Sequence, residues 1–293
     1  MVKFTLGKKM KPVCLVLGAG AGIGGNVAKK FSAEGYHVCI CRRTDENGLN
    51  LLIKTIEESG GSATGFLIDV IKDNVIEDLI KNVEKNIGSI DVVVYNLGAQ
   101  TGMKLLHETT IKEFEWGWKI ANLGLFRLAK SICPLMEKRK KGTILVTSAT
   151  AAMRGNENQH SHASAMGGRR MLCQTLNAEF SKKGIHIAHI VIDGMVDAPD
   201  TLGKILGPKL YQKLRETKGM ANDGLVLPEN VANTYFHLHN SYYSCNNYEK
   251  QVEHLHWHKD LMNKELHELD SPNLDVVLDH RIEDIISYSP CTV

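Results

Sequence analysis

A glycine-rich turn near the N-terminus constrains the fold more than any other stretch of this chain. In LVLGAGAGIGGNVAKKF, residues 15 to 31, Gly18, Gly22 and Gly24 stand between an apolar run and the start of an amphipathic segment. Glycine permits a tight turn and a close backbone approach, and a helix N-terminus offers free N–H groups and a positive dipole end to an anion. A strand, this turn and a helix in succession therefore predict a site for the diphosphate of a dinucleotide.

Short aliphatic runs alternate with helix-length amphipathic segments over most of the chain. The runs are VCLVL (13 to 17), HVCIC (37 to 41), SATGFLI (62 to 68), DVVVY (91 to 95), GTILVT (142 to 147) and IHIAHIVI (185 to 192). Nearly continuous apolar strands are typical of a parallel sheet that helices cover on both faces, so this rhythm predicts repeated βαβ units. With right-handed crossovers the expected fold class is α/β, a Rossmann-like, doubly wound, mostly parallel sheet with helices on both faces.

Composition excludes several function classes. A formal net charge of +2 over 293 residues gives no reason to expect a nucleic acid as partner. The seven cysteines are scattered and include no C-x-x-C pair, which argues against a disulfide framework and a thiolate zinc site and favours the reducing cytoplasm. No apolar stretch is long enough to cross a bilayer, and the first apolar run ends in glycines after Leu17, so neither a membrane partner nor a signal peptide is expected.

We expect one dinucleotide-binding domain over residues 12 to 240, with a substrate loop near 195 to 225, and an atypical extension over residues 241 to 293. The extension contains no glycine, is rich in histidine, and carries ten acidic against four basic side chains from Glu249 onward. VEHLHWHKDLMNKELHEL could form a helix, which would spread its histidines apart, whereas HLHWH, residues 254 to 258, would place three histidines on one face if it formed a strand. No second ligand cluster with recognisable spacing accompanies it, so no metal site is predicted.

The spacing G-x-x-x-G-x-G resembles that of the short-chain dehydrogenase/reductase family. Arg42 and Arg43 follow the second apolar run, where an acidic residue would hold the ribose of NAD and where basic residues can pair with the 2′-phosphate of NADP. The resemblance therefore implies NADP(H) in preference to NAD(H). The alternative is that both arginines are solvated surface groups.

Further segments match this family over roughly residues 12 to 240. LIDV contains the family's adenine-contacting Asp, YNLG (95 to 98) stands where the family shows Asn-Asn-Ala-Gly, and IVIDGMVDAPDT resembles its loop after the sixth strand. The cofactor-binding residues that the resemblance implies are Gly18, Gly22, Ile23, Gly24, Arg42, Arg43, Asp69, Val70, Asn96, Gly98, Gly194 and Val196.

The catalytic positions depart from the family pattern. In the family a Ser, a Tyr and a Lys four residues after the Tyr do the chemistry: the Lys lowers the pKa of the phenol, which exchanges a proton with the substrate oxygen as hydride moves. The resemblance places Ala149 at the Ser position, His162 at the Tyr position and Met166 at the Lys position, with Ser148 one residue early. Asn122, in IANLGLF, matches the family's active-site asparagine.

Two interpretations follow. In the first, the protein is an oxidoreductase in which His162 is the acid/base, since a reference pKa of about 6.5 suits proton transfer, and Ser148 orients a carbonyl oxygen. In the second, it is a catalytically impaired NADP(H)-binding pseudo-enzyme, sensor or interaction protein, because Met166 cannot carry charge. Arg170, one turn beyond Met166, is a candidate for the missing cation, although arginine on a helix is more commonly a surface group.

The resemblance also bears on substrate and assembly. It implies a small-molecule carbonyl or alcohol substrate and a homodimer or homotetramer. LPENVANTYFHLHN resembles the family's late Pro-Glu-Asp-Val-Ala helix, but the usual strand after that helix has no counterpart in the sequence. NLDVVLD, residues 273 to 279, is one candidate for the missing strand.

Overall fold

The computed structural model describes residues 11–98, 103–218, 224–244 and 254–258. Its strands are β1 (Val13–Leu17), β2 (His37–Arg42), β3 (Ser62–Leu67), β4 (Ile90–Tyr95), β5 (Gly142–Ala149), β6 (Ile185–Asp193) and β7 (His254–His258). Its α-helices are α1 (Ile23–Ala33), α2 (Glu46–Glu58), α3 (Val75–Asn86), α4 (Ile111–Trp118), α5 (Gly124–Arg139), α6 (His160–Phe180), α7 (Lys204–Leu206), α8 (Pro208–Lys218) and α9 (Pro228–Ser244).

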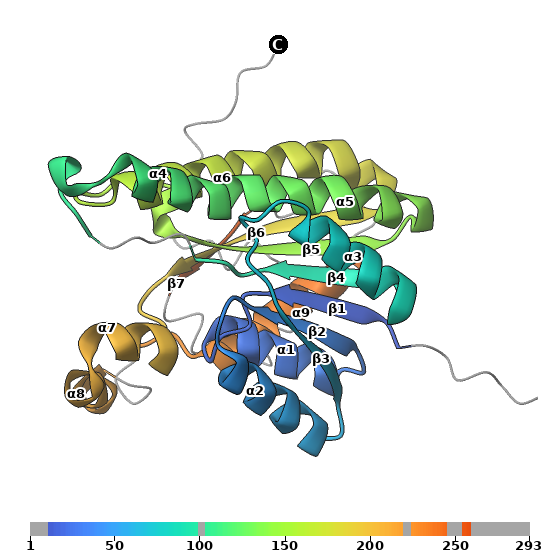
Figure 1. The fold of residues 1–293 in the computed structure, drawn as a ribbon, viewed down its shortest axis with the longest axis horizontal. Coiled ribbons are helices and arrows are strands. Elements are labelled where there is room, and N and C mark those ends of the chain that lie inside the picture. Colours follow the sequence, from blue (N-terminus) through green and yellow to red (C-terminus); the bar gives the residue numbers. More distant parts are fainter. Residues whose placement is uncertain (1–10, 99–102, 219–223, 245–253, 259–293) are drawn as a thin grey trace, which may run out of the picture.

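The strands form one parallel sheet in the order β3-β2-β1-β4-β5-β6-β7. Helices lie on both faces of this sheet, as Figure 1 shows. The doubly wound Rossmann-like α/β class is therefore confirmed, and each of the six apolar runs forms a strand. The strand order reverses between β1 and β4, which is where open α/β sheets bind their ligands, at the carboxyl ends of the strands.

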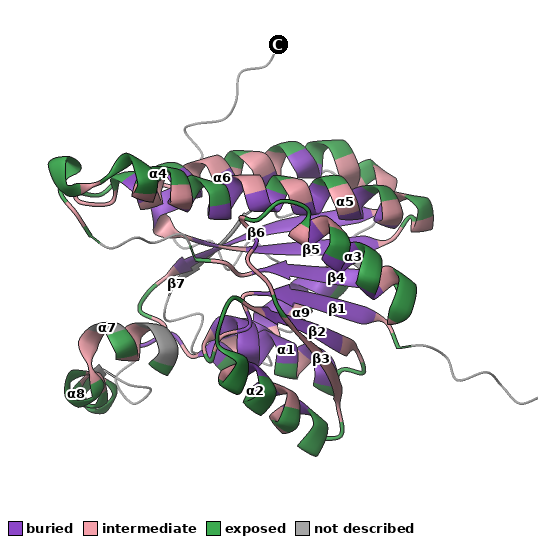
Figure 2. Ribbon diagram, viewed as in Figure 1, coloured by how far each residue is buried: buried purple, intermediate pink, exposed green. Residues whose placement is uncertain are grey.

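Alternate strand residues bury their side chains in two separate layers. In β1, Val13, Leu15 and Leu17 pack with α3, α5 and α6, whereas Cys14 and Val16 pack with α1, α2 and α9. The inner strands β1, β2, β4, β5 and β6 are buried along most of their length, the edge strand β3 is only partly buried, and the helices present an exposed outer side (Figure 2). This double burial explains why the strand sequences are nearly continuous apolar runs.

The HLHWH segment forms the edge strand β7, which pairs in parallel register with β6 so that His189 is opposite His254 and Asp193 is opposite His258. The region expected as a C-terminal extension thus contributes a strand to the sheet. The other candidate strand, residues 273 to 279, lies outside the described residues. Within the described ranges, no group of three or more His, Cys, Asp or Glu side chains is arranged to hold a metal ion.

Candidate functional site

The glycine-rich turn lies at the carboxyl end of β1, directly at the point where the strand order reverses. Gly18 has φ +92°, and a β-carbon built on it would lie 2.6 Å from the carbonyl oxygen of Asn96. A β-carbon on Gly24 would lie 2.1 Å from the carbonyl oxygen of Gly18 and 2.8 Å from Asn96 Nδ2. Because no side chain fits at either position, the first turn of α1 packs against the turn itself.

The N-terminus of α1 is available to an anion. Its N-cap is Gly22, and within the described residues no side chain caps the helix there, although the N–H of Gly25 donates to Gly20 O over 2.8 Å. Uncapped N–H groups and the positive end of the helix dipole together make an anion site. A β-carbon on Gly22 would lie 2.8 Å from Cβ of Ala198, so the segment after β6 packs directly on the turn.

Asn96 holds the ends of three strands together beneath this turn. Its Nδ2 donates to the carbonyl oxygen of Gly18 over 2.9 Å, and its Oδ1 accepts from Thr147 Oγ1 over 2.8 Å. Thr147 also shares a 2.7 Å hydrogen bond with the Tyr235 hydroxyl of α9. The side chain expected at the cofactor site therefore fixes the relative positions of β1, β4 and β5.

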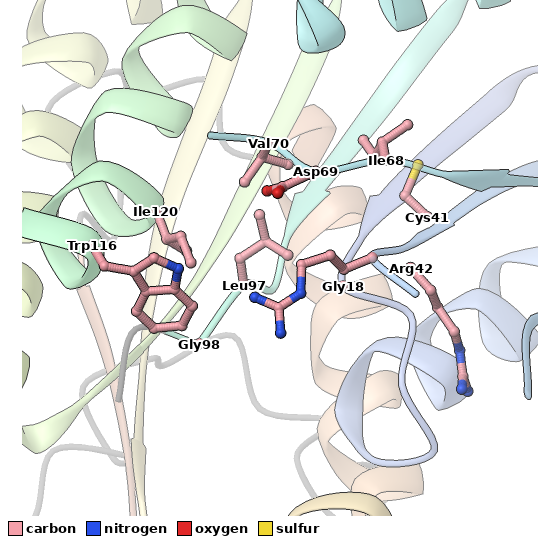
Figure 3. A pocket seen from close by; sticks show the side chains of 11 residues that line it. Gly18, Cys41, Arg42, Ile68, Asp69, Val70, Leu97, Gly98, Trp116 and Ile120 are labelled. Atoms are coloured by element: carbon pink, nitrogen blue, oxygen red, sulfur yellow. The ribbon is translucent and has the colours of Figure 1, made fainter. Parts of the chain in front are cut away.

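A pocket of about 220 Å³ opens beside the turn. Figure 3 shows Trp116 and Ile120 on one side of it, and Cys41 and Arg42 on the other. Six expected cofactor residues line the pocket, namely Gly18, Arg42, Arg43, Asp69, Val70 and Gly98. The other lining residues were not predicted: Cys41, Ile68, Leu97, Trp116 and Ile120.

The two arginines at the carboxyl end of β2 are held differently. Arg42 donates from Nε to the carbonyl oxygen of Ala19 over 2.7 Å and forms an ion pair with Asp45, the N-cap of α2. Arg43 is exposed, and its guanidinium lies 5.9 Å from the centre of the Trp116 ring, across the pocket. The pocket therefore carries one arginine that a carboxylate already pairs and one that an aromatic ring supports.

Asn122 lies in a π-helical turn, Lys119–Leu123, which joins α4 to α5. Its side chain is 5% exposed and donates from Nδ2 to the carbonyl oxygen of Ala165 over 3.1 Å. A β-carbon on Gly168 would lie 2.9 Å from Asn122 Oδ1, so glycine allows the two elements to approach closely. Asn122 thus joins the π-helical turn to α6.

The positions assigned to catalysis gather at the carboxyl end of β5 and the start of α6. Ser148 is buried, and its hydroxyl lies 3.7 Å from Sδ of Met166, which is 2% exposed. Ala149 ends β5, as the resemblance placed it. His162 is partly exposed in the first turn of α6. The structure therefore brings Ser148 against the methionine that stands at the family's Lys position.

The loop after β6 packs on the glycine-rich turn through Ala198 and is held by contacts of its own. Gly194 and Val196 follow the strand, and Val196 forms an isolated bridge with Val226. Asp197 accepts hydrogen bonds from the Tyr211 hydroxyl and, over 3.1 Å, from Arg215 Nε. These contacts attach α8 to the loop, and Figure 1 shows α7 and α8 on the side toward which the strand arrows point.

The family model described as short chain dehydrogenase matches residues 12–204. The chain belongs to the short-chain dehydrogenase family. It is 30% identical over 207 residues to the 3-oxoacyl-acyl-carrier-protein reductase FabG of Thermotoga maritima, covering 70% of this chain and 80% of that protein. It is also 30% identical over 227 residues to the short-chain reductase protein NovJ of Streptomyces niveus, covering 76% and 84%.

Solved structures show the same fold. A short-chain dehydrogenase from Rhodopseudomonas palustris superposes with a TM-score of 0.67 at 26% identity, covering 84% of this chain and 98% of that one. A variant of actinorhodin polyketide ketoreductase, solved with NADPH, gives a TM-score of 0.72 at 24% identity and covers 87% and 98%.

The buried cation of α6 is Arg169, which was not predicted. Arg169 is 1% exposed, whereas Arg170, the residue that sequence reasoning considered, is partly exposed. A signal for Arg169 existed: it lies three residues after Met166 and seven after His162, which is the spacing of one helix face. Arginine on a helix is more commonly a surface group, so this spacing alone does not predict burial.

Proposed function

We propose that this protein is an NADP(H)-dependent oxidoreductase that transfers hydride to or from a small-molecule carbonyl or alcohol, through an active site that departs from the Tyr and Lys of its family. The observation that carries the proposal is the uncapped N-terminus of α1, set on a turn where only glycine fits and beside a pocket bearing two arginines. That arrangement suits the diphosphate and the adenosine half of a dinucleotide.

The preference for NADP(H) rests on the charges of the pocket. Arg43 forms no ion pair within the described part of the chain, and its contact with Trp116 keeps the guanidinium across the pocket. Arg42 is already held by Asp45, so it contributes less net positive charge. A 2′-phosphate accepts charge-assisted hydrogen bonds from such groups, whereas the 2′-hydroxyl of NAD offers no negative charge to them.

The residues at the end of β5 are proposed to act on the substrate. A bound nicotinamide supplies or accepts hydride at its C4 atom. Ser148 donates a hydrogen bond to the substrate oxygen. Its hydroxyl can leave its present acceptor for that oxygen, because the thioether sulfur of Met166 is only a weak acceptor. His162 exchanges the proton with that oxygen, and Asn122 keeps the helix that carries His162 in place through Ala165.

A second function is favoured by Met166. The side chain at the family's Lys position is buried, apolar and in contact with the Ser148 hydroxyl, so it cannot tune the pKa of an acid/base. The second candidate is a catalytically impaired NADP(H)-binding pseudo-enzyme that acts as a sensor or interaction protein.

Hydride transfer separates the two functions. NADPH absorbance is followed against a panel of ketones and aldehydes with the native protein, His162→Ala and the control His160→Ala, which changes an exposed histidine in the same turn. Loss of a positioned acid/base typically costs about 10²- to 10⁴-fold, so turnover should fall by that factor only in His162→Ala. NADPH binding without turnover in all three proteins would instead establish the second function.

The substrate is proposed at the level of a carbonyl or alcohol, because the relatives' names include a 3-oxoacyl reductase and a 7alpha-hydroxysteroid dehydrogenase.

A homodimer or homotetramer is proposed because Phe126 of α5 and Met171 of α6 are large apolar residues that are about half exposed. A cytoplasmic location is proposed because the five cysteines in the described ranges are free thiols. No helix in the described part of the chain has the length and apolar character needed to span a membrane.

A further inference from the structure

Arg169 places a positive charge inside the protein, where its hydrogen-bond partners are backbone carbonyl groups. Its guanidinium donates from Nε to Ala121 O over 3.2 Å, from Nη1 to Thr147 O over 2.7 Å and from Nη2 to Leu97 O over 2.9 Å. It also lies 5.3 Å from the centre of the Tyr95 ring. All of these partners are neutral, and no carboxylate of the described residues pairs with Arg169.

The surrounding structure is shaped to hold this charge. The π-helical turn presents its carbonyl groups inward, where Tyr95 Oη donates to Ile120 O and Arg169 Nε to Ala121 O. Burial lowers the pKa of Arg169 from its usual value, but a guanidinium stays protonated in proteins. A buried charge is costly even when it is hydrogen-bonded, which makes an uncompensated one a candidate for a functional role.

The charge lies under one particular half of the proposed nucleotide site. A dinucleotide spans the point of strand reversal, with one mononucleotide on each side of it. Arg42, Arg43 and Asp69 place the adenosine half over β1, β2 and β3, so the nicotinamide half belongs over β4, β5 and β6. Two of the carbonyl groups that hold Arg169 belong to this half: Leu97, after β4, directly precedes Gly98, and Thr147, in β5, directly precedes Ser148.

The oxidised and reduced cofactors differ in charge at that half alone. The nicotinamide ring of NADP⁺ is positively charged and that of NADPH is neutral, whereas the adenosine and diphosphate parts are identical. We propose that Arg169 makes this site selective for the reduced dinucleotide, because its buried charge repels the oxidised ring. This inference rests on the proposed nucleotide site but not on turnover, and it applies equally to an enzyme and to a sensor.

Coulomb's law gives the size of the effect. Two unit charges on the order of 10 Å apart at an effective dielectric constant of about 20 correspond to a selectivity of roughly tenfold. The buried position also predicts how selectivity responds to salt. Screening at high ionic strength weakens exposed charges such as Arg43 far more than buried ones, so the ratio of affinities should persist at high salt.

The test compares the affinities of NADPH, NADP⁺ and 2′-phospho-ADP-ribose, which lacks the nicotinamide ring, by isothermal calorimetry. The native protein should bind NADPH about tenfold more tightly than NADP⁺. Arg169→Met should reduce this ratio toward one without changing the affinity for 2′-phospho-ADP-ribose. Arg169→Lys should keep much of the ratio, and Arg170→Met, one residue further along α6, should leave it unchanged.

The outcomes separate the inference from the function on which it rests. If 2′-phospho-ADP-ribose does not bind the folded native protein, the nucleotide site itself is refuted. If it binds but NADPH and NADP⁺ bind equally, only the role of Arg169 is refuted. If Arg169→Met does not fold, the native protein still decides: a ratio that disappears in high salt overturns the inference, and one that persists supports it.

Discussion

Replacing Gly24 with alanine tests the diphosphate site where its geometry is tightest. The added β-carbon would lie 2.1 Å from Gly18 O and 2.8 Å from Asn96 Nδ2, whereas ordinary contacts are about 3.4 Å or longer. Helix α1 must therefore move away from the turn by about 1 Å. That shift also breaks the hydrogen bond from Asn96 to Gly18.

The cost follows from these contacts. Overpacking of this kind costs about 1–3 kcal/mol, and the lost hydrogen bond about 1 kcal/mol. Alanine regains up to about 1 kcal/mol of helix propensity, which leaves a net loss of stability of about 2 kcal/mol. Displaced amides also lose hydrogen bonds to the diphosphate, and one charge-assisted bond is worth about 1.5–3 kcal/mol, so NADPH affinity should fall at least about tenfold.

Gly20→Ala is the matched control, because a β-carbon at Gly20 meets nothing within 4 Å. Urea unfolding measures the stability of both variants, and calorimetry at a temperature where both are folded measures NADPH binding. Equally tight NADPH binding by Gly24→Ala and Gly20→Ala would show that the close approach at Gly24 does not position the diphosphate site.

Two further predictions concern charge. Arg43→Ala should weaken NADPH binding by about tenfold at low salt, as expected for the loss of one charge-assisted hydrogen bond. The affinity for NADH should stay unchanged, and equal losses for both dinucleotides would contradict a role of Arg43 at the 2′-phosphate. Burial lowers the pKa of His186 and of His239 from 6.5 to about 4, and Lys141 adds to the effect at His239. Between the folded-state pKa of about 4 and the unfolded-state pKa of 6.5, these histidines bind more protons in the unfolded chain than in the folded one. Stability therefore falls as the pH falls through this window. At pH 5 the loss is about 2 kcal/mol for each histidine relative to pH 7.5. Urea unfolding at both pH values measures it, and His239→Gln should remove about half of the difference, whereas the exposed His107→Gln should remove none.

Much of the fold was predictable because it depends on local patterns. A strand buried on both faces needs a continuous apolar run, and the six runs became β1 to β6 with end positions within two residues of those expected. The glycine turn was predictable for a related reason. Its constraint is steric and local, since Gly18 needs a positive φ and Gly24 has no room for a side chain.

Other parts depend on long-range packing, which a single sequence does not show. Trp116 and Ile120 line the pocket because the π-helical turn at Lys119–Leu123 sets the orientation of α4 relative to the sheet. No residue type in the sequence predicts such a turn. Arg169 is buried because three carbonyl groups from distant segments converge on it. The sequence left open whether HLHWH forms a strand or part of a helix, since a histidine-rich segment lacks the composition of an ordinary strand, and the structure shows the strand β7.

The proposed binding of the diphosphate of a dinucleotide by main-chain amides at the start of α1 underlies every other role assigned to the pocket. Calorimetric titration of the folded native protein with NADPH, and with NADH as comparison, tests this claim most directly. We expect saturable binding of one NADPH per chain, tighter than that of NADH. The absence of a saturable signal for either dinucleotide would contradict it.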